Sequence, residues 1–386
     1  MSLRTDVTAH PAATPYAPDP EAIPLDGRHH LATTPDTARW GELPHAGSVP
    51  VLAVADGDTV TFDLVSHEGI LPDQGRDPVA FFGSFGVPED RVPRDAREIA
   101  ESGLGLTQTL PGPHIVTGPV AVRGARPGDL LRVETLSLHR RTHYGIVSNR
   151  HAAGALPGEL PDGEAEFTGP DTRRCIGGTV SSFCTVERDG TGAESGVLRY
   201  GPGRAARFPL GPFVGVMGVA TADETALSSV PPGRHGGNLD IKHLTCGSSL
   251  YLPVQAEGAG FYAGDPHFAQ GNGEVALTAL EAPLRATFRL SLVRGSAARR
   301  VTGLLGEPFA ETAAHWIALG LDADLDEAMR QCVRSALDFL TTRTGMDRAT
   351  AYAYLSAAAD FEVSQVVDRI KGVHCMIRKA DFRAET

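Results

Sequence analysis

Cysteine is scarce in this sequence, with five in 386 residues. The five are scattered along the chain, their number is odd, and no two form a CxxC pair. A disulfide framework or a cysteine-rich zinc site needs closely and regularly spaced cysteines. The cysteine pattern therefore predicts free thiols and argues against both kinds of cross-link.

Long apolar runs are also missing. No stretch approaches the roughly 20 consecutive apolar residues that a membrane-spanning helix needs. The first residues, 1–26, are rich in proline and alanine and lack the apolar core of a signal peptide. We therefore expect a cytoplasmic protein with no membrane partner, and an N-terminal arm over 1–26 that is disordered or packed on a partner subunit.

Positive charge is in deficit. The chain has 35 Lys and Arg against 47 Asp and Glu, a formal net charge of −12 at pH 7. Nucleic acids and anionic membranes bind to clustered basic side chains, so neither is expected as a partner. A neutral or cationic small substrate is compatible with this balance, although solubility alone accounts for it.

Several compact catalytic motifs are absent. The sequence contains no phosphate-binding P-loop, no GxGxxG fingerprint after a strand, no GxSxG elbow and no HExxH. The function must therefore be sought in a more dispersed pattern.

Glycine and proline are abundant, at 44 and 28 residues, which favours tight turns and short strands over long helices. In 59–64 the apolar Val60, Phe62 and Leu64 alternate with polar residues, the period of a half-buried strand. Residues 286–294 alternate in the same way. These patterns predict a mainly β fold with a β-sandwich or mixed-sheet core, α+β overall.

The expected helices lie near the C-terminus. Asp324 is a plausible N-cap for a helix that carries apolar residues at spacings of three and four and ends at Gly345. A second helix is expected to begin at Asp347. We therefore predict a two-helix unit within a helical part of about 309–368, following a β core of about 48–300.

We expect one intertwined domain over 27–386, because no clean linker interrupts it. Residues 145–170 are expected as a surface loop, and 69–112 as irregular chain with one short helix near 93–103. The segments 119–129 and 253–265 share Pro-Val, Gly-Ala and Gly-Asp pairs, which suggests a duplicated β unit. Common Gly-Asp turns are the alternative explanation.

The stretch 235–274 concentrates polar groups among glycines and apolar runs, with three histidines, two aspartates and two glutamates. Asp265 and His267 stand at i and i+2, which places both on one face of an extended segment. Asp240 could add a third ligand, and three protein ligands with an open position are typical of catalytic zinc. The alternative is that Asp265 caps a turn and His267 hydrogen-bonds in the core.

Three further residues are candidates for the same site. Glu274 is expected at the start of a strand, where an apolar cavity would raise its pKa and allow it to shuttle protons. A solvated glutamate at a strand end fits equally well. His67 and His114 flank predicted strands and could reach the cavity, although each could also be a structural histidine.

The whole segment HGGNLDIKHLTCGSSLYLPVQAEGAGFYAGDPHFAQGNGE resembles the most distinctive stretch of the acetamidase/formamidase family. DGRHHLATTPDTARWG, HIVTGPVAVRGARPGDLLRVE, PFVGVMGVA and SQVVDRIKGVHCMIRK are similar to family segments in the expected order. The resemblance covers nearly the whole chain from about residue 26. It departs from the family pattern at Asn272, where aspartate is usual, and across 69–112.

The resemblance implies a homodimer or higher homo-oligomer that hydrolyses a small amide, formamide-like or acetamide-like, to a carboxylate and ammonia. It also implies a divalent metal, zinc by preference, at acidic and histidine positions. Residues that fall on matching positions are Asn238, Asp240, Asp265, His267, Gln270 and Glu274, with His67 and His114 as second-rank ligands.

The mechanism expected from these positions has zinc at Asp240, Asp265 and His267, activating water and polarising the carbonyl. Glu274 would move the proton from water to nitrogen, and Asn238 or Gln270 would hold the substrate amide. A lactamase acting on a cyclic amide, or a non-catalytic β scaffold that binds a metal or ligand, are the alternative functions.

Overall fold

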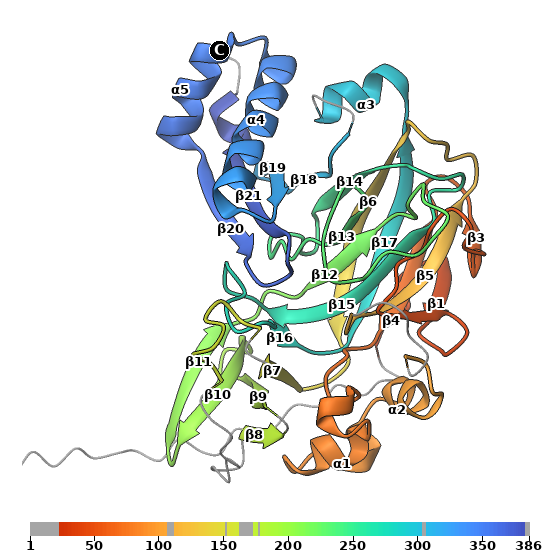
Figure 1. Ribbon diagram of the computed structural model, residues 1–386, viewed down its shortest axis with the longest axis vertical. Coiled ribbons are helices and arrows are strands. Elements are labelled where there is room, and N and C mark those ends of the chain that lie inside the picture. Colours follow the sequence, from red (N-terminus) through yellow and green to blue (C-terminus); the bar gives the residue numbers. More distant parts are fainter. Residues whose placement is uncertain are drawn as a thin grey trace, which may run out of the picture.

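Two large β-sheets make up most of the chain (Figure 1). The computed structural model describes residues 23–105, 112–150, 153–161, 173–176, 178–302 and 306–382. The first sheet has nine strands, in the spatial order β1 (His29–Ala32), β4 (Thr59–Leu64), β17 (Leu284–Val293), β6 (Leu130–Arg140), β14 (Ser249–Pro253), β18 (Phe309–Glu311), β19 (His315–Asp322), β21 (Lys371–Arg378) and β20 (Asp360–Gln365).

The second sheet carries the candidate site. Its main path runs β11 (Arg204–Pro209), β10 (Glu194–Gly201), β9 (Thr179–Arg188), β7 (Tyr144–Arg150), β16 (Leu280–Glu281), β15 (Phe261–Ala269), β12 (Phe213–Gly218) and β13 (Gly236–Asn238). Four further strands join it at the side, namely β2 (Ala38–Trp40), β3 (Leu52–Val54), β5 (Ile115–Val122) and β8 (Arg173–Ile176). The mainly β, α+β prediction is confirmed.

The two sheets are joined by an apolar core between them. Phe62 and Phe288 come from the first sheet and Phe261 from the second, with ring centroids 5.7–5.8 Å apart in edge-to-face arrangements. All three side chains are fully buried. The apolar residues of the alternating segments thus meet in a sandwich core, as their period of two predicts.

Strand β4 is buried on both faces, so the prediction of a half-buried strand is wrong. Its second face carries Thr61 and Asp63, which the start of the described chain covers. The Gly27 amide donates to Thr61 Oγ1 at 2.8 Å, and the guanidinium of Arg285 donates to the Ile23 carbonyl at 2.6 Å. Residues 23–26 of the expected arm therefore pack on the chain's own sheet, and 1–22 lie outside the described residues.

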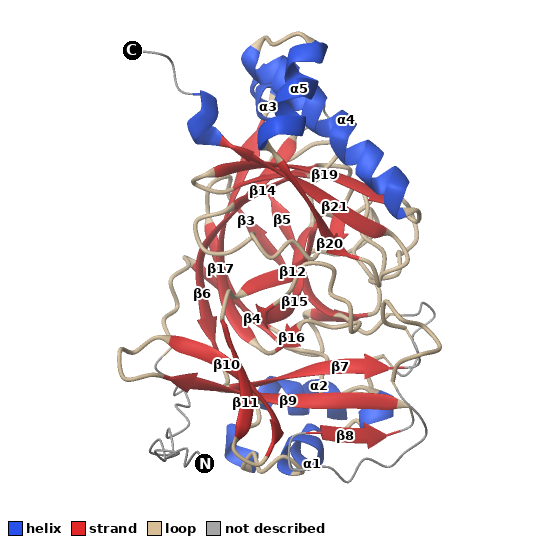
Figure 2. Ribbon diagram, turned by 90° about the vertical axis from the view of Figure 1, so that its left-hand side faces the viewer, coloured by secondary structure: helices blue, strands red, loops and turns tan. Residues whose placement is uncertain are grey.

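The C-terminal helices begin and end where their capping signals predict. In α4 (Leu325–Thr344) the Asp324 carboxylate accepts from the Glu327 amide, and Gly345 closes the helix with a φ of 77°. In α5 (Arg348–Ala358) the Asp347 carboxylate accepts from the amides of residues 349 and 350. The α4 helix packs closely on β19 and β21, sharing one apolar cluster with them (Figure 2).

Several expected boundaries need correction. The expected helical part, 309–368, also contains β18, β19 and β20, and β21 follows it. Helices also occur earlier, as α1 (Pro78–Gly83), the predicted short helix α2 (Arg94–Glu101) and α3 (Gly295–Thr302), with 3₁₀ turns at Pro72–Gln74, Glu89–Arg91 and Lys379–Phe382. Residues 144–150, expected at the start of a loop, form β7. The single-domain expectation stays a prediction.

The suggested duplication is not supported by the positions of the two similar segments. Gly128 and Asp129 lie in the turn before β6, whereas Gly264 and Asp265 lie inside β15. The shared residue pairs therefore serve different local structures. No helix in the described part of the chain combines the length and apolar character required to cross a membrane.

A buried ion pair joins the neighbouring strands β4 and β17 of the first sheet. The Arg285 guanidinium contacts both carboxylate oxygens of Asp63, at 2.6 and 3.0 Å, and His30 lies 2.8 Å away. Burial alone would raise the pKa of Asp63, but Arg285, Arg141 and His30 lower it below its ordinary value. The pair therefore stabilises the fold at pH values above the ordinary aspartate pKa. This contribution is lost as the pH falls through the lowered pKa of Asp63.

We expect Asp63→Asn to reduce the free energy of unfolding at pH 7 by about 3 kcal/mol, because it leaves a buried guanidinium without its carboxylate. The loss should shrink as the pH falls below about 4, the ordinary aspartate pKa, and disappear below the lowered pKa of the folded Asp63 carboxylate. Urea unfolding across this pH range measures both effects. Asp36→Asn, at an exposed carboxylate, is the control. An equal loss at all pH values would contradict this account.

Candidate functional site

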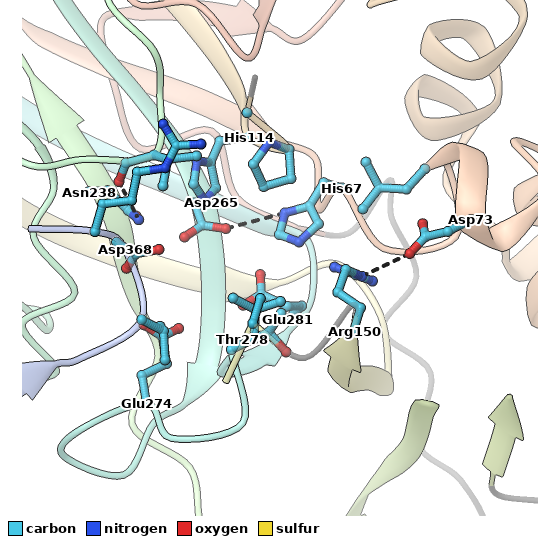
Figure 3. A pocket seen from close by; sticks show the side chains of 18 of the residues that line it. His67, Asp73, His114, Arg150, Asn238, Asp265, Glu274, Thr278, Glu281 and Asp368 are labelled. Carbon is cyan, nitrogen blue, oxygen red and sulfur yellow. Dashed lines mark hydrogen bonds and ion pairs between the residues drawn. The ribbon is translucent and has the colours of Figure 1, made fainter. Parts of the chain in front are cut away.

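A cavity of about 600 Å³ opens beside the second sheet (Figure 3). Polar side chains reach it from distant parts of the sequence, and apolar side chains complete its wall. The polar lining comprises His67, Asp73, His114, Arg150, Asn238, Asp265, Glu274, Thr278, Glu281, Asp368 and Arg369. Leu71, Val230, Leu277 and Val367 are among the apolar residues.

Strand β15 supplies the central pair of this cluster. Asp265 Oδ2 and His267 Nε2 lie 2.9 Å apart, and both side chains are buried. The i, i+2 prediction that these side chains share one face is therefore confirmed. His267 lies beneath the residues that line the cavity, whereas Asp265 lines it directly.

Asp240 follows β13 and lies against the same pair. Its Oδ1 is 3.9 Å from His267 Nδ1, and the Asp240 amide donates to the Gly215 carbonyl at 3.3 Å. Gly215, on β12, leaves room for the cluster. A Cβ atom there would lie 2.5 Å from Asp240 Oδ1, 2.7 Å from Asp265 Oδ2 and 2.7 Å from His267 Cε1. Any larger residue at this position would displace the three side chains.

The loop after β15 carries Glu274 and Gln270. Glu274 is buried and lines the cavity, but it lies in a loop with a φ of 46°, so its expected place at the start of a strand is wrong. Gln270 does not line the cavity. Its amide nitrogen donates to the carbonyls of Asp240, at 2.9 Å, and Ser364, at 3.2 Å. These contacts indicate that Gln270 positions the backbone of Asp240 instead of holding a substrate.

Both histidines that flank predicted strands reach the cavity. His67 Nδ1 lies 3.5 Å from Asp265 Oδ1, and its Nε2 lies 3.4 Å from Glu68. The His114 ring packs edge-on against the His67 ring, with centroids 5.7 Å apart, and its Nδ1 contacts the Ser229 hydroxyl at 3.0 Å. His67 thus lies within reach of the acidic cluster, while His114 is held by Ser229.

Asn238, at the end of β13, also lines the cavity. Its side-chain nitrogen donates to the Val230 carbonyl at 3.1 Å, which fixes the orientation of the amide. The Asn238 Oδ1 atom is buried without a hydrogen-bond partner. This oxygen is therefore available to accept a hydrogen bond from a molecule in the cavity.

Sequence reasoning missed two acidic members of the cluster. Glu281 lies on β16 directly opposite His267, with Oε1 at 3.0 Å from His267 Nε2. Asp368 lies in the turn between β20 and β21 and lines the cavity beside Asn238 (Figure 3). A signal for Glu281 exists in TALEAPL, where one carboxylate interrupts an apolar run. Asp368 lies in a segment quoted for the family resemblance, but nothing local marks it.

Backbone strain is concentrated at this cavity. Among the described residues, non-glycine positions with positive φ are uncommon, as sterics require. Five of them line the cavity or lie in the cluster beneath it: Asp240 at 50°, Asp265 at 56°, Glu274 at 46°, Leu277 at 104° and Arg369 at 67°. Strained backbone of this kind persists where the surrounding structure enforces it, and it clusters at functional sites.

Burial and mutual repulsion raise the pKa of most carboxylates in the cluster. Burial, followed by the charge of Asp368, raises the pKa of Asp240, and burial with Asp240 raises that of Glu274. Burial and Asp265 raise the pKa of Glu281 to about 7. Five acidic groups thus compete for too few positive charges in a water-poor site.

The imidazoles compensate only in part. Burial opposes the charged form of His67, but Asp265 and Glu68 raise its pKa to about 10. Burial likewise disfavours the charged form of Asp265, yet His267 and His114 lower its pKa well below the ordinary value. Burial lowers the pKa of His114 to about 4, so this ring stays neutral. An additional cation would relieve the remaining repulsion.

The donor atoms fit a divalent metal. The possible ligand atoms of His67, Asp265 and Glu281 lie within 4.8 Å of one another, as do those of Asp240, His267 and Glu274. Both ring nitrogens of His67 and of His267 are buried without a hydrogen bond, although carboxylates lie within 3.5 Å. Imidazole nitrogens and carboxylate oxygens are donor types that zinc prefers, so these residues fit such an ion.

The sequence matches the Acetamidase/Formamidase family over residues 211–378. It is 30% identical over 201 residues to a formamidase of Methylophilus methylotrophus, covering 45% of this chain and 48% of that protein. An acetamidase of Mycolicibacterium smegmatis is 30% identical over 198 residues, covering 42% and 49%. The matched region thus spans about half the length of these curated relatives.

The fold gives the same relationship over more of the chain. The crystal structure of an acetamidase from Bacillus halodurans superposes with a TM-score of 0.66 and 26% identity, covering 92% of this chain and 98% of that one. The family segment at 211–378 contains Gly215, Asn238, Asp240 and β15 with its Asp265–His267 pair. Residues 211–378 thus match the acetamidase/formamidase family, and the fold of this chain is similar to that of an acetamidase.

Proposed function

We propose that this protein hydrolyses the C–N bond of a small linear amide to a carboxylate and ammonia. The buried cluster of carboxylates and imidazoles with unpaired donor atoms is the observation that carries the proposal. The match of residues 211–378 to the acetamidase/formamidase family, and the similarity to proteins named formamidase and acetamidase, support it. The apolar wall made by Leu71, Val230 and Leu277 suits an uncharged substrate.

We infer that a divalent metal, zinc by its donor types, is held by His67, Asp265 and Glu281, all of which line the cavity. A bound metal of this kind supplies Lewis acidity, which polarises a carbonyl and lowers the pKa of water. His267 Nε2 lies within 3.0 Å of the carboxylates of Asp265 and Glu281 and orients them, without lining the cavity itself. Of the expected ligands, this assignment retains Asp265 and the second-rank His67. It adds Glu281, and it gives Asp240 and His267 a supporting role.

The residues of the cavity have separate roles in amide hydrolysis. An amide resists attack because resonance stabilises it and its nitrogen leaves poorly. Asn238 Oδ1, buried and unpartnered, accepts a hydrogen bond from the substrate NH₂ and so orients the carbonyl carbon. Water adds its oxygen to this carbon, Glu274 takes the released proton, and the C–N bond breaks as Glu274 delivers that proton to nitrogen. Burial and the neighbouring Asp240 raise the pKa of Glu274, which favours the carboxylate holding a proton between the two transfers.

We expect Glu274→Gln to reduce kcat for acetamide or formamide by 10²–10⁴-fold, the range typical of a lost general acid–base group. The amide side chain keeps the shape of the carboxylate but cannot take up a proton. Steady-state kinetics together with metal analysis by mass spectrometry measure the effect. Glu257→Gln, at an exposed position, is the control. Near-normal turnover with metal retained would assign proton transfer to another residue.

Gly215→Ala should weaken zinc binding at the cavity by more than tenfold, because the new methyl group displaces Asp240, Asp265 and His267 together. Zinc affinity is measured by competition with a chromogenic chelator, and circular dichroism checks that the fold is kept. In Gly211→Ala the added Cβ meets nothing within 4 Å, so this variant should bind zinc normally. Unchanged affinity in Gly215→Ala would contradict the ligand assignment.

Exhaustive chelation should abolish amide hydrolysis, and added Zn²⁺ should restore it. A panel of formamide, acetamide, longer linear amides and small lactams then separates linear amidase activity from the lactamase alternative. Full activity after chelation would remove the metal from the mechanism, and no turnover of any amide by the metal-loaded protein would favour a non-catalytic scaffold. The expected homo-oligomer and cytoplasmic location stay predictions.

A further inference from the structure

A second group of possible metal ligands lies outside the cavity lining. It consists of His243, three residues after Asp240, together with Glu362 on β20 and His374 on β21. Glu362 and His374 stand directly opposite each other in the antiparallel pair. The His243 and His374 rings lie with centroids 5.3 Å apart and interplanar angle 71°. Their possible ligand atoms all lie within 4.8 Å of one another.

His374 is prepared as a ligand. It is fully buried, and its Nδ1 lies 2.7 Å from the Ser364 hydroxyl, which fixes the ring. Its Nε2 points toward Glu362 Oε2 at 3.4 Å, yet this nitrogen is buried without a hydrogen bond. An unsatisfied buried polar atom costs about 1–3 kcal/mol, and a ring fixed through one nitrogen with the other free is the usual state of a metal-binding histidine.

The other two donors converge on the same point. Glu362 Oε2 lies 3.1 Å from His243 Nε2 and 3.4 Å from His374 Nε2. Ligand atoms around a tetrahedral zinc ion, bound at about 2.0–2.1 Å, are separated by roughly 3.3 Å. The side chains of His243 and Glu362 are each 27% exposed, so solvent can supply a fourth ligand. We propose that His243, Glu362 and His374 form a second site for Zn²⁺ or a similar transition-metal ion, separate from the catalytic cavity.

An ion at this position would fasten the segments that carry the cavity residues. Asn272, two residues before Glu274, donates to Glu362 Oε2 at 2.5 Å. The Ser364 carbonyl accepts from the Gln270 side chain and from the Gly273 amide, at 3.2 and 3.0 Å. The site therefore joins the loop after Asp240, the loop of Glu274 and the β20–β21 hairpin, whose turn contains Asp368. Its role is structural: it holds three separate segments in register.

The protonation states favour metal binding at neutral pH. Metal ligands must be deprotonated to bind. Burial, with smaller effects from His243 and Lys242, lowers the pKa of His374, although Glu362 opposes this shift. His374, and with it His243 and Asn272, lowers the pKa of Glu362 against the effect of burial. At pH 7 the His374 imidazole is therefore neutral and the Glu362 carboxylate is charged, which are the forms that bind a metal.

The test compares the full-length wild type with His243→Gln, in which the glutamine amide still donates to Glu362 but is a poor zinc ligand. Both proteins are stripped with chelator, dialysed against buffered Zn²⁺ and analysed for zinc per chain by mass spectrometry. We expect the variant to bind one fewer tight zinc ion per chain, with affinity at that site reduced more than tenfold. Zn²⁺ should also raise the Tm of the wild type more than that of the variant.

His139→Gln is the matched control, because His139 pairs with Asp26 at 2.9 Å and is similarly exposed, but has no second imidazole nearby in the described chain. It should bind as many zinc ions as the wild type. Asp265→Asn should lose zinc from the cavity and keep the ion at His243, which separates this inference from the proposed catalytic metal. Equal zinc content and affinity in the wild type and His243→Gln would overturn the proposal.

Discussion

Burial of many carboxylates in one place is the constraint on which the site depends. Asp240, Asp265, Glu274, Glu281 and Asp368 are all nearly inaccessible to solvent. Removing a carboxylate from water costs several kcal/mol unless partners compensate. The imidazoles of His67 and His267 compensate in part, and a bound cation would compensate for much of the remainder. The surrounding backbone adopts uncommon positive φ values where these side chains come together. Placing the charged groups therefore constrains the backbone around the cavity.

The two sheets contribute differently to this arrangement. The second sheet supplies Asp265, His267 and Glu281 from adjacent strands, which fixes their spacing through backbone hydrogen bonds. The first sheet supplies Asp368 from the hairpin at its far edge, which reaches the Glu274 loop through the pairing of Gly273 with Gln365. The same hairpin carries Glu362 and His374. A metal at His243 would therefore strengthen a contact between sheets that otherwise relies on a few hydrogen bonds.

Local signals predicted the secondary structure best where the neighbouring residues alone decide it. The caps at Asp324, Gly345 and Asp347 act within one helical turn, so the helix ends were predicted correctly. Strand β19 and the β20–β21 hairpin were missed, because their apolar residues pack against helices and β19 pairs with β21 across the whole helical segment. The burial of the second face of β4 was not predicted, because residues 23–27, which cover this face, precede β4 by more than thirty residues in the sequence.

The sequence by itself determined the resemblance to the family, the mainly β class and the core of the site. Asp265 and His267 share one strand, and their spacing places them on one face. Only the tertiary structure identified Glu281 and Asp368, moved Gln270 from the cavity to the Asp240 backbone, and brought His243 to Glu362 and His374. Each of these relationships joins separate strands or loops, and spacing along a chain carries no information about which strands pair. The stretch 235–274 thus contains three of the five carboxylates of the cluster, and the strand β16 and the C-terminal hairpin supply the other two.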